Sequence, residues 1–393
     1  MRIVHTSDWH LGKIVSEYSM LEDQRYILHQ LIQFLQDFRA DVLLISGDLY
    51  DRSIPGADAV RLADEILSEI ASHHISVFLI AGNHDSPERL SFLSGLLSVE
   101  GIYIAGMPEI PVRRVTLEDS FGPVHFFLLP YLEPGDLRPL FPDRVHTYDE
   151  AIGAVAETFL PSLQKDERNI LLAHGFFSYV GKDGQPVDPA VFSASETSLG
   201  GTDLVNAARF SCFDYAAFGH LHAPQQTGFP HMRYSGSLLK YSASEAGQKK
   251  SVTCIELCEK GNCTITQHSL SPLRDLRMIQ GNFSDLCRYG RESDPHPEDY
   301  IYAVLTDPAP ILDGALLLKS VFPNLMGLRY EQDLFTGQEN LLSAEAIRQK
   351  SQTDLFGAFY LSLTGEPLSP DQQALFEDVL HTVRRTEHEK EGY

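Results

Sequence analysis

The chain has 393 residues, of which 43% are hydrophobic and 22% charged, so it is long enough for more than one folded domain. Its formal net charge of −23 argues against a protein that coats nucleic acid with a broad basic surface. No stretch approaches about 18 consecutive apolar residues and the first residues are already polar, so we expect no membrane span, no signal peptide and a cytoplasmic location.

Five short apolar runs up to about residue 270 each lead into side chains that can bind metal. Short apolar runs closed by turn residues predict buried strands. The runs are Ile3-Val4 before Asp8 and His10, Val42–Ile45 before Asp48, Val77–Ile80 before Asn83, His84 and Asp85, Ile170–Leu172 before His174, and Tyr215–Phe218 before His220 and His222. Helical patterns at 26–38 and 59–70 lie between them. This alternation predicts an α/β protein, in which ligands gather at the carboxyl ends of strands.

After about residue 272 the sequence changes to an alternation of shorter predicted strands and helices. It predicts, in order, a strand at 276–279, a helix at 283–289, a strand at 300–305, a helix at 312–321 and a strand at 325–330. We therefore expect a first domain at 1–271 and a small second domain at 272–332. Residues 333–393 are acidic and helical in pattern, with apolar stripes at 355–363 and 375–383. Ser369, Pro370 and Gln372 fit a helix N-cap, N1 and N3.

The five cysteines are odd in number and loosely spaced, without the paired Cys-x-x-Cys of a zinc ribbon. We expect free, buried thiols at Cys212, Cys254, Cys258, Cys263 and Cys287.

The polar clusters supply what a two-metal site needs. Two divalent ions about 3.5–4 Å apart require one bridging carboxylate and separate oxygen and imidazole ligands for each ion. Asp48 is the natural bridge, Asn83 offers an amide oxygen, and the histidines offer neutral nitrogens. Each cluster alone is a weak signal, but five at strand ends favour a metal site formed by Asp8, His10, Asp48, Asn83, His174, His220 and His222. Gly47, Gly82 and Gly219 precede ligands, where a tight turn favours a residue without Cβ.

The order of these clusters, Asp-x-His, Gly-Asp, Gly-Asn-His-Asp, His and Gly-His-x-His, resembles the calcineurin-like metallophosphoesterase superfamily. Within it, residues 5–12, 47–51, 81–86 and 234–237 are similar to the SbcD family, the nuclease subunits of bacterial SbcCD complexes. The specific motifs cover residues 1–270. The resemblance implies two mixed sheets flanked by helices, a small α+β capping domain that contacts DNA, and a helical C-terminal tail.

The resemblance also implies how the residues divide their work. One ion would be bound by Asp8, His10, Asp48 and His222, and the other by Asp48, Asn83, His174 and His220, both typically Mn²⁺. Together they would make hydroxide available for in-line attack on a phosphodiester. His84 matches a histidine that contacts phosphate and helps to protonate the leaving oxygen, with Asp85 as its orienting partner. Some relatives carry a second such histidine where this chain has Asp51, so we expect no catalytic role for Asp51, which would cap its loop, hold Arg52 or be a solvated loop acid.

The activity that the resemblance implies is that of an ATP-regulated DNA nuclease, a 3′–5′ double-strand exonuclease and a single-strand or hairpin endonuclease, acting in end processing, replication and recombination. The apolar stripes of the tail would bind an SbcC-type SMC-like ATPase, with two nuclease chains in a heterotetramer; the alternative is that the stripes close an internal helical pair. Basic residues near the motif loops are candidate phosphate contacts or an ordinary solvated surface: Lys13, Arg52, Arg89, Lys182, Lys240, Lys249 and Lys250.

Two other hypotheses remain open on the sequence. The metal site is equally compatible with a superfamily member that hydrolyses a phosphomonoester, a cyclic nucleotide or a phosphoprotein, because the surrounding loops choose the substrate. A DNA-end-binding scaffold without catalysis is the non-enzymatic alternative. Two apolar stripes in the tail favour the nuclease, and the presence of all seven candidate ligands disfavours the scaffold.

Overall fold

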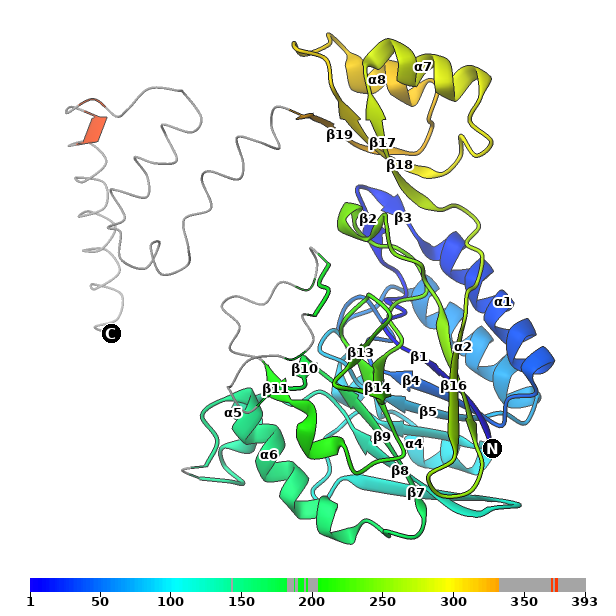
Figure 1. Cartoon of the computed structure of the whole chain (residues 1–393), viewed down its shortest axis with the longest axis vertical. Helices are drawn as coiled ribbons and strands as arrows, with labels where there is room; N and C mark the ends of the chain where they lie inside the picture. The colour runs from blue at the N-terminus through cyan, green and yellow to red at the C-terminus, as the bar shows by residue number, and fades with distance from the viewer. Residues whose placement is uncertain are drawn as a thin grey trace. The chain divides into compact units, whose positions relative to one another are not determined.

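The computed structural model describes residues 1–142, 144–181, 187, 190–193, 196, 204–331, 369 and 372–373. Contacts divide the chain into one unit at Met1–Glu331 and a second at Gln332–Tyr393. Two six-stranded sheets, a three-stranded sheet, two two-stranded sheets and the helices beside them make up the described part of the first unit (Figure 1).

The first sheet has the order β16-β15-β1-β4-β5-β6. Its strands β1, β4, β5 and β6 run parallel, β15 pairs antiparallel with β1, and β16 pairs antiparallel with β15. The bounds are β1 (Arg2–Thr6), β4 (Val42–Ser46), β5 (Ser76–Ile80), β6 (Ile102–Ala105), β15 (Val252–Leu257) and β16 (Cys263–His268).

The second sheet has the order β13-β14-β12-β9-β8-β7 and is also mixed. Its central strands β8, β9, β12 and β14 are parallel, and antiparallel strands close both edges. The bounds are β7 (Arg113–Asp119), β8 (Gly122–Leu129), β9 (Arg168–His174), β12 (Tyr215–Gly219), β13 (Gln225–Thr227) and β14 (Phe229–Tyr234).

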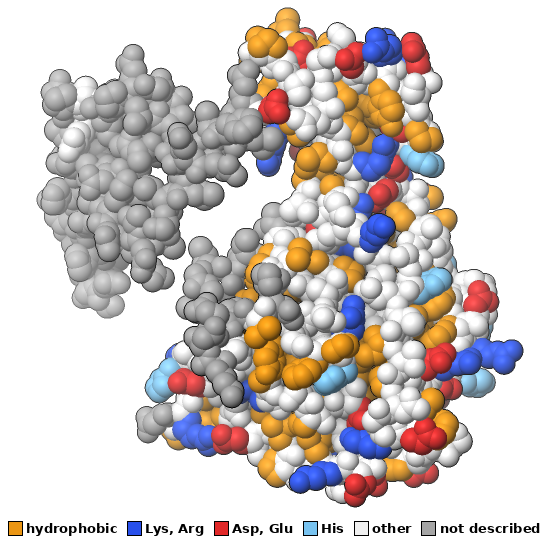
Figure 2. All heavy atoms as spheres, in the orientation of Figure 1, with side chains coloured by type: hydrophobic (Ala, Val, Ile, Leu, Met, Phe, Trp, Pro, Cys, Tyr) orange, Lys and Arg blue, Asp and Glu red, His pale blue; other side chains and the backbone are white. Residues whose placement is uncertain are grey.

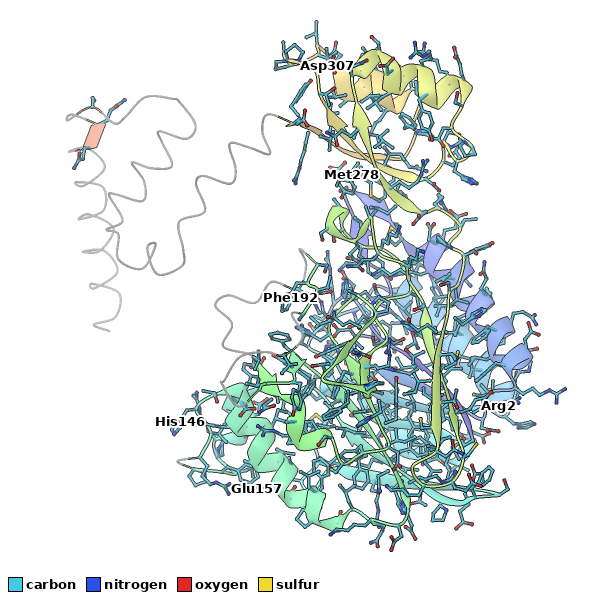
Figure 3. All side chains as sticks on the ribbon, in the orientation of Figure 1. Arg2, His146, Glu157, Phe192, Met278 and Asp307 are labelled. Carbon is cyan, nitrogen blue, oxygen red and sulfur yellow. The ribbon has the colours of Figure 1, made fainter. Side chains whose placement is uncertain are left out.

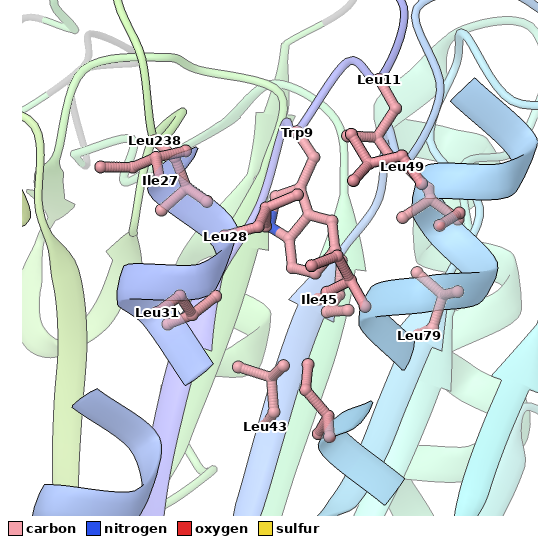
Figure 4. Close-up of a cluster of buried hydrophobic side chains, with 14 of the residues drawn as sticks. Trp9, Leu11, Ile27, Leu28, Leu31, Leu43, Ile45, Leu49, Leu79 and Leu238 are labelled. Atoms are coloured by element: carbon pink, nitrogen blue, oxygen red, sulfur yellow. The ribbon is translucent and has the colours of Figure 1, made fainter. Parts of the chain in front are cut away.

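Helices cover the outer faces of both sheets, which gives a helix–sheet–sheet–helix sandwich. The long helices are α1 (Leu21–Phe38), α2 (Ala57–Ser72) and α6 (Tyr148–Phe159). Along β4, Val42 and Leu44 pack between the sheets, whereas Leu43 and Ile45 pack under α1 and α2. Because strand side chains alternate between faces, one continuous apolar run can serve two cores. Figure 4 shows the outer core, where Trp9 lies among side chains of α1 and β4.

Shorter elements connect these layers. They are β2 (Ile14–Val15), β3 (Tyr18–Ser19), α3 (Pro87–Leu90), α4 (Ser94–Leu97), η1 (Ser98–Glu100), α5 (Pro134–Leu137), η2 (Leu160–Ser162), β10 (Phe177–Ser178), β11 (Val205–Asn206), η3 (Ala207–Phe210) and η4 (Ala243–Glu245).

The small sheet, β17-β18-β19, is parallel throughout and carries two helices. Its elements are β17 (Leu276–Gly281), α7 (Phe283–Glu292), β18 (Tyr300–Leu305), α8 (Gly314–Lys319) and β19 (Leu325–Tyr330). Ile301, Leu318 and Phe322 are buried at the centre of its own core. In Figure 3, Met278 on β17 and Asp307 after β18 mark this part of the chain.

The predicted fold class, two mixed sheets flanked by helices, is confirmed. The five predicted strands are β1, β4, β5, β9 and β12, and the predicted alternation after residue 272 is also present. The tail stripes at 355–363 and 375–383 lie outside the described residues. Ser369 and Gln372 do form the reciprocal bonds of an N-terminal cap, at 3.3 Å and 2.9 Å.

Two other sequence predictions meet the structure directly. All five cysteines are free, but only Cys254 is buried; Cys212 is exposed, and the other three are half-buried. Within the described ranges, no helix is long and apolar enough to cross a membrane.

Candidate metal centre

The carboxyl ends of five strands meet at one edge of the sandwich and bring the predicted ligands together. In the first sheet, Thr6 pairs with Ile45 and Ser46 pairs with Ile80, so β1, β4 and β5 end level with one another. In the second sheet, His174 at the end of β9 lies opposite Gly219 at the end of β12. The loops after these strands therefore face a common space, as expected for parallel strands.

One half of the site contains two histidines and an aspartate. His10 Nε2 and His222 Nε2 lie 3.1 Å apart, and one ligand atom each from these histidines and Asp8 falls within 4.8 Å of the others. The carboxylate of Asp8 accepts a hydrogen bond from the backbone N–H of His220 at 3.0 Å. Two imidazole nitrogens and a carboxylate oxygen at this spacing form a donor set that suits a divalent transition metal.

The other half of the site is built around the amide of Asn83. Its Oδ1 lies 3.0 Å from His174 Nε2 and 3.1 Å from His220 Nδ1. These three side chains come from the ends of β5, β9 and β12, which belong to both sheets. An amide oxygen with two imidazoles is again a donor set for a divalent ion.

Asp48 lies between the two halves. A single oxygen, Oδ2, is 3.7 Å from His10 Nε2 and 3.5 Å from His174 Nε2. The other oxygen, Oδ1, accepts the backbone N–H of His84 at 2.9 Å, which fixes the orientation of the carboxylate. The structure thus gathers all seven predicted ligands, with Asp48 at the centre.

Burial and neighbouring charges set the protonation of these groups. Burial lowers the pKa of His10 well below its ordinary value and that of His220 to about 3, so both imidazoles are neutral. Burial alone would raise the pKa of Asp48, but His174 beside it holds the pKa below its usual range. Burial lowers the pKa of His174, yet Asp48 outweighs this and raises it to about 9. His174 would have to release that proton to act as a ligand.

The backbone around the ligands is unusual. Asp8, His10, Asp48 and His220 all have positive φ, between 47° and 107°, a region that non-glycine residues seldom adopt. Gly47 also has a positive φ, of 91°. The sequence explained Gly219 by a tight turn, but its φ is not positive. Gly219 is required instead because a neighbouring backbone leaves no room for a side chain. A Cβ on Gly219 would lie 1.8 Å from the carbonyl oxygen of Ser46.

His84 faces the site, but its partner is not the one expected. Its Nδ1 lies 2.9 Å from the carbonyl oxygen of Asp51, and its ring packs edge-on against His10 with centroids 4.8 Å apart. Asp85 instead accepts three backbone N–H groups, from Leu49, Tyr50 and Gly82, at 3.0–3.1 Å. Asp85 therefore ties the loop after β4 to the loop after β5.

Asp51 braces this loop from the other side. Its carboxylate accepts a hydrogen bond from Lys13 at 2.6 Å, and Arg52 lies farther away, at 3.7 Å. The expected contact with Arg52 is thus the weaker of the two. The carboxylate is also 3.7 Å from His10 Nδ1, so Asp51 touches both His10 and, through its backbone, His84.

Several supporting residues were missed on the sequence. The carbonyl of Ser46 accepts from His174 Nδ1 at 2.8 Å, and the side chain of Gln24 donates to the carbonyls of Trp9 and His10 at 3.1 Å and 2.8 Å. Glu196, Glu245 and Tyr241 belong to the same group around the ligand loops, as does Lys250, which the sequence offered only as a candidate phosphate contact or solvated residue. The sequence contained one signal for Gln24: its spacing places this polar residue on the same helix face as Ile27, Leu28 and Leu31, and that face is buried in α1.

The basic residues near the site are mostly engaged in internal contacts. Lys13 binds Asp51, Lys240 binds Asp275, Lys250 binds Glu245, and Arg89 binds the carbonyl of Ser53. Arg52 and Lys249 are exposed, and Lys182 lies outside the described residues. Lys and Arg side chains lie singly among other types on the face in Figure 2, so this face presents no broad basic surface among its described residues.

This fold and this cluster define a metallophosphoesterase, and comparisons with known proteins agree. The family model for calcineurin-like phosphoesterases matches residues 1–224, and a model for the type 5 capsule protein repressor C-terminal domain matches residues 272–364. The SbcD chain of the SbcCD nuclease from Staphylococcus epidermidis is 32% identical over 390 residues, covering 98% of this chain and 99% of the relative. The chain belongs to the SbcD family of calcineurin-like phosphoesterases.

Solved structures give a more distant likeness. A dimetal phosphatase from Danio rerio covers 68% of this chain and 96% of its own length, with 14% identity and a TM-score of 0.42. That likeness is too distant to bear on substrate.

The residues present fit divalent metals. In the described part of the chain, three groups of His and Asp side chains have ligand atoms close enough to hold an ion: Asp8–His10–His222, His10–Asp48–His84 and Asp8–Asp48–His174. Ligand sets that combine imidazole with carboxylate favour transition-metal ions, because Ca²⁺ and Mg²⁺ prefer oxygen ligands.

Proposed function

We propose that this chain is the metal-dependent nuclease subunit of an SbcCD-type complex and that it cleaves DNA phosphodiesters at the Asp48 centre. The main support for this proposal is the position of Asp48, whose Oδ2 lies within 3.7 Å of one imidazole in each half of the site. A carboxylate shared by two donor sets is what a two-metal phosphoesterase requires. The SbcD relative supports DNA as the substrate.

The two halves would hold separate ions, Mn²⁺ being the proposed native metal. Asp8, His10 and His222 would form one ligand set, and Asn83, His174 and His220 the other, with Asp48 common to both. When bound, the ions supply Lewis acidity and lower the pKa of the attacking water. The protein's own part is to fix the donors and to place His84 beside them.

His84 is the proposed contact to the scissile phosphate. Its Nδ1 points at the carbonyl oxygen of Asp51, so Nδ1 carries the proton in that hydrogen bond and Nε2 is left for the substrate. When Nε2 is protonated as well, that proton can pass to the leaving oxygen. Asp85 supports this indirectly, because it binds the backbone N–H of Gly82 in the loop of His84 and that of Tyr50 in the loop of Asp51.

We predict that His84→Ala lowers Mn²⁺-dependent cleavage of linear duplex DNA by about 10²–10⁴-fold, the usual contribution of a general acid. Mn²⁺ binding should persist, because His84 is outside both proposed ligand sets. The assay follows end-labelled DNA with and without an SbcC-type ATPase. The matched control is His29→Ala, a half-exposed histidine paired with Glu65 and Glu69 on α2. Equal cleavage by wild type and His84→Ala would remove His84 from the reaction.

The DNA assay, run in parallel with hydrolysis assays on other phosphoesters and with a DNA-binding assay, separates the alternatives. Hydrolysis of a phosphomonoester or cyclic nucleotide, without cleavage of DNA under any condition, would favour another superfamily activity. Binding of DNA ends without any metal-dependent hydrolysis would favour the scaffold. A 3′–5′ direction and single-strand or hairpin cleavage are proposed here by likeness to the SbcD family.

The rest of the chain is proposed to bind DNA and the partner. Residues 272–332 would contact DNA beside the site, and residues 333–393 would dock on the ATPase through their apolar stripes. The acidic balance of the chain supports a division of labour in which the partner provides much of the DNA binding.

We also propose a homodimer, which the family suggests and one surface supports. A short segment over α3, α4 and η1 exposes four large apolar side chains, with Phe92 at 71%, Leu96 at 68% and Val99 at 81% exposure, beside Leu93. So many apolar side chains in one exposed segment are typical of an interaction surface. The same segment on a second copy is its proposed occupant.

We predict that Leu96→Glu weakens self-association by about 30-fold, which corresponds to about 2 kcal/mol for a central apolar contact. Sedimentation across a concentration series measures the dissociation constant. Leu140→Glu, which changes a leucine of similar exposure on a different loop, is the control. An unchanged dimer in Leu96→Glu would place the interface elsewhere.

A further inference from the structure

Two charged side chains are buried directly behind His222. Glu245, in η4, has no exposed side-chain surface and lies with Oε1 3.3 Å from His222 Nδ1. Lys250 is 7% exposed and donates to Glu245 Oε2 at 2.6 Å. Both lie beyond residues 1–224, the part of the chain that the phosphoesterase model matches.

Lys250 fixes the position of Glu245 relative to His222. Its ammonium group lies 2.9 Å from the backbone carbonyl of His222 and 2.9 Å from Ser237 Oγ, in addition to its contact with Glu245. One cation thus holds both the carboxylate and the backbone of the histidine that the carboxylate faces. Ser242 Oγ donates to Glu245 Oε1 at 3.0 Å and restrains the oxygen that faces the imidazole.

This geometry selects one form of the imidazole. A carboxylate can only accept, so His222 Nδ1 carries the proton and Nε2 presents its lone pair toward His10 Nε2, 3.1 Å away. Glu196 is a less suitable partner for the ring. Its Oε1 lies 3.5 Å from Nδ1 and already accepts the backbone N–H of His222.

The two halves of the site are supported differently. His174 is backed by a neutral group, the carbonyl of Ser46, at 2.8 Å. His222 is backed by a buried carboxylate, which orients the ring and also makes its nitrogen a stronger electron donor. The half that contains His222 should therefore bind a cation more tightly than the half that contains His174.

We propose that Glu245, held by Lys250, is the positioning residue of His222 and that it makes the Asp8–His10–His222 half the tighter of two cation positions. This rests on the proposed metal centre. Glu245 and Lys250 would act only through His222, and the proposal requires no contact between either of them and the substrate.

The proposal is tested by titrating the metal-free chain with Mn²⁺ alone. Calorimetry and electron paramagnetic resonance of the bound ion measure the binding. The wild type should show a tight and a weak class of sites, and His174→Ala should lose the weak one. Glu245→Gln should weaken the tight class by about 10–100-fold and leave the weak class unchanged. Glu167→Gln is the matched control, because Glu167 pairs with His125 at the opposite ends of the strands. It should bind Mn²⁺ as the wild type does.

A second variant guards against misfolding. Glu245→Gln combined with Lys250→Gln removes both charges, so no unpaired ion is buried, and the tight class should weaken as in the single variant. Wild-type tight binding in either folded variant would overturn the role of Glu245, as would loss of the weak class instead. Absence of Mn²⁺ binding by the wild type would instead contradict the proposed metal centre.

Discussion

Replacing Asp48 with Asn is expected to lower Mn²⁺-dependent DNA cleavage by at least about 10³-fold, which corresponds to about 4 kcal/mol of transition-state stabilisation. Asp48 Oδ2 faces His10 and His174 at 3.7 Å and 3.5 Å, so it is common to both halves of the site. An amide keeps the shape and loses the charge. Both proposed ligand sets are therefore weakened by one substitution.

The effect should appear in binding as well as in rate. Calorimetric titration of Asp48→Asn with Mn²⁺ should show both classes of sites weakened, and removal of metal from the wild type by a chelator should reproduce the loss of cleavage. Asp37→Asn, on the exposed side of α1, is the matched control. Two intact Mn²⁺ sites in Asp48→Asn would show that Asp48 does not bridge.

Replacing Gly219 with Ala is expected to destabilise the fold by about 3 kcal/mol, at the upper end of overpacking effects. The new Cβ would lie 1.8 Å from the carbonyl oxygen of Ser46 and 2.9 Å from His174 Nδ1. The first neighbour is backbone at the end of β4 and cannot rotate away. The ends of β4 and β12, which belong to different sheets, would have to separate.

Urea unfolding of the metal-free chain measures this cost, and Mn²⁺ titration shows whether the site survives. Gly135→Ala is the control, because nothing lies within 4 Å of a Cβ at Gly135 and the change should stay within about 1 kcal/mol. Wild-type stability in Gly219→Ala would mean that the two sheet ends tolerate separation.

The sequence was most informative where a strand and the ligand after it are close together along the chain. Val42–Ile45 is continuously apolar because both faces of the strand are covered, and this pattern predicts a buried strand. Asp48 follows three residues later. The same holds for the runs before Asn83, His174 and His220. Because strand ends in such folds meet at one edge, an ordered set of local signals was enough to predict the site. The role of Asp48 as the bridge remains a proposal.

Residues that depend on distant partners were not predictable in this way. Glu245 reaches His222 from 23 positions along the chain, and Lys250 reaches the same residue from 28, without any local pattern. The start of α1 was placed too late, at 26, because its first turn is polar. Asp23 and Gln24 in that turn are nevertheless buried, Asp23 against Tyr300 of β18 and Gln24 against the loop that carries His10.

The division of the strands between two sheets also needed the structure. The hairpin of β15 and β16 pairs with β1 across some 250 residues, and β7 and β8 begin the second sheet. Nothing local says which strand pairs with which. The family resemblance, and not the hydrophobic pattern, implied two mixed sheets.

The positive φ of Asp8, His10, Asp48 and His220 sets two demands on the same positions. A backbone in this region favours glycine; Asp and His adopt it more often than most other residues do, but each still costs on the order of 1 kcal/mol relative to glycine. Metal binding calls for carboxylate and imidazole instead. Selection for stability and selection for activity therefore favour different residues at these four places. A variant library screened only for folding would be expected to drift away from the very residues that hold the metal.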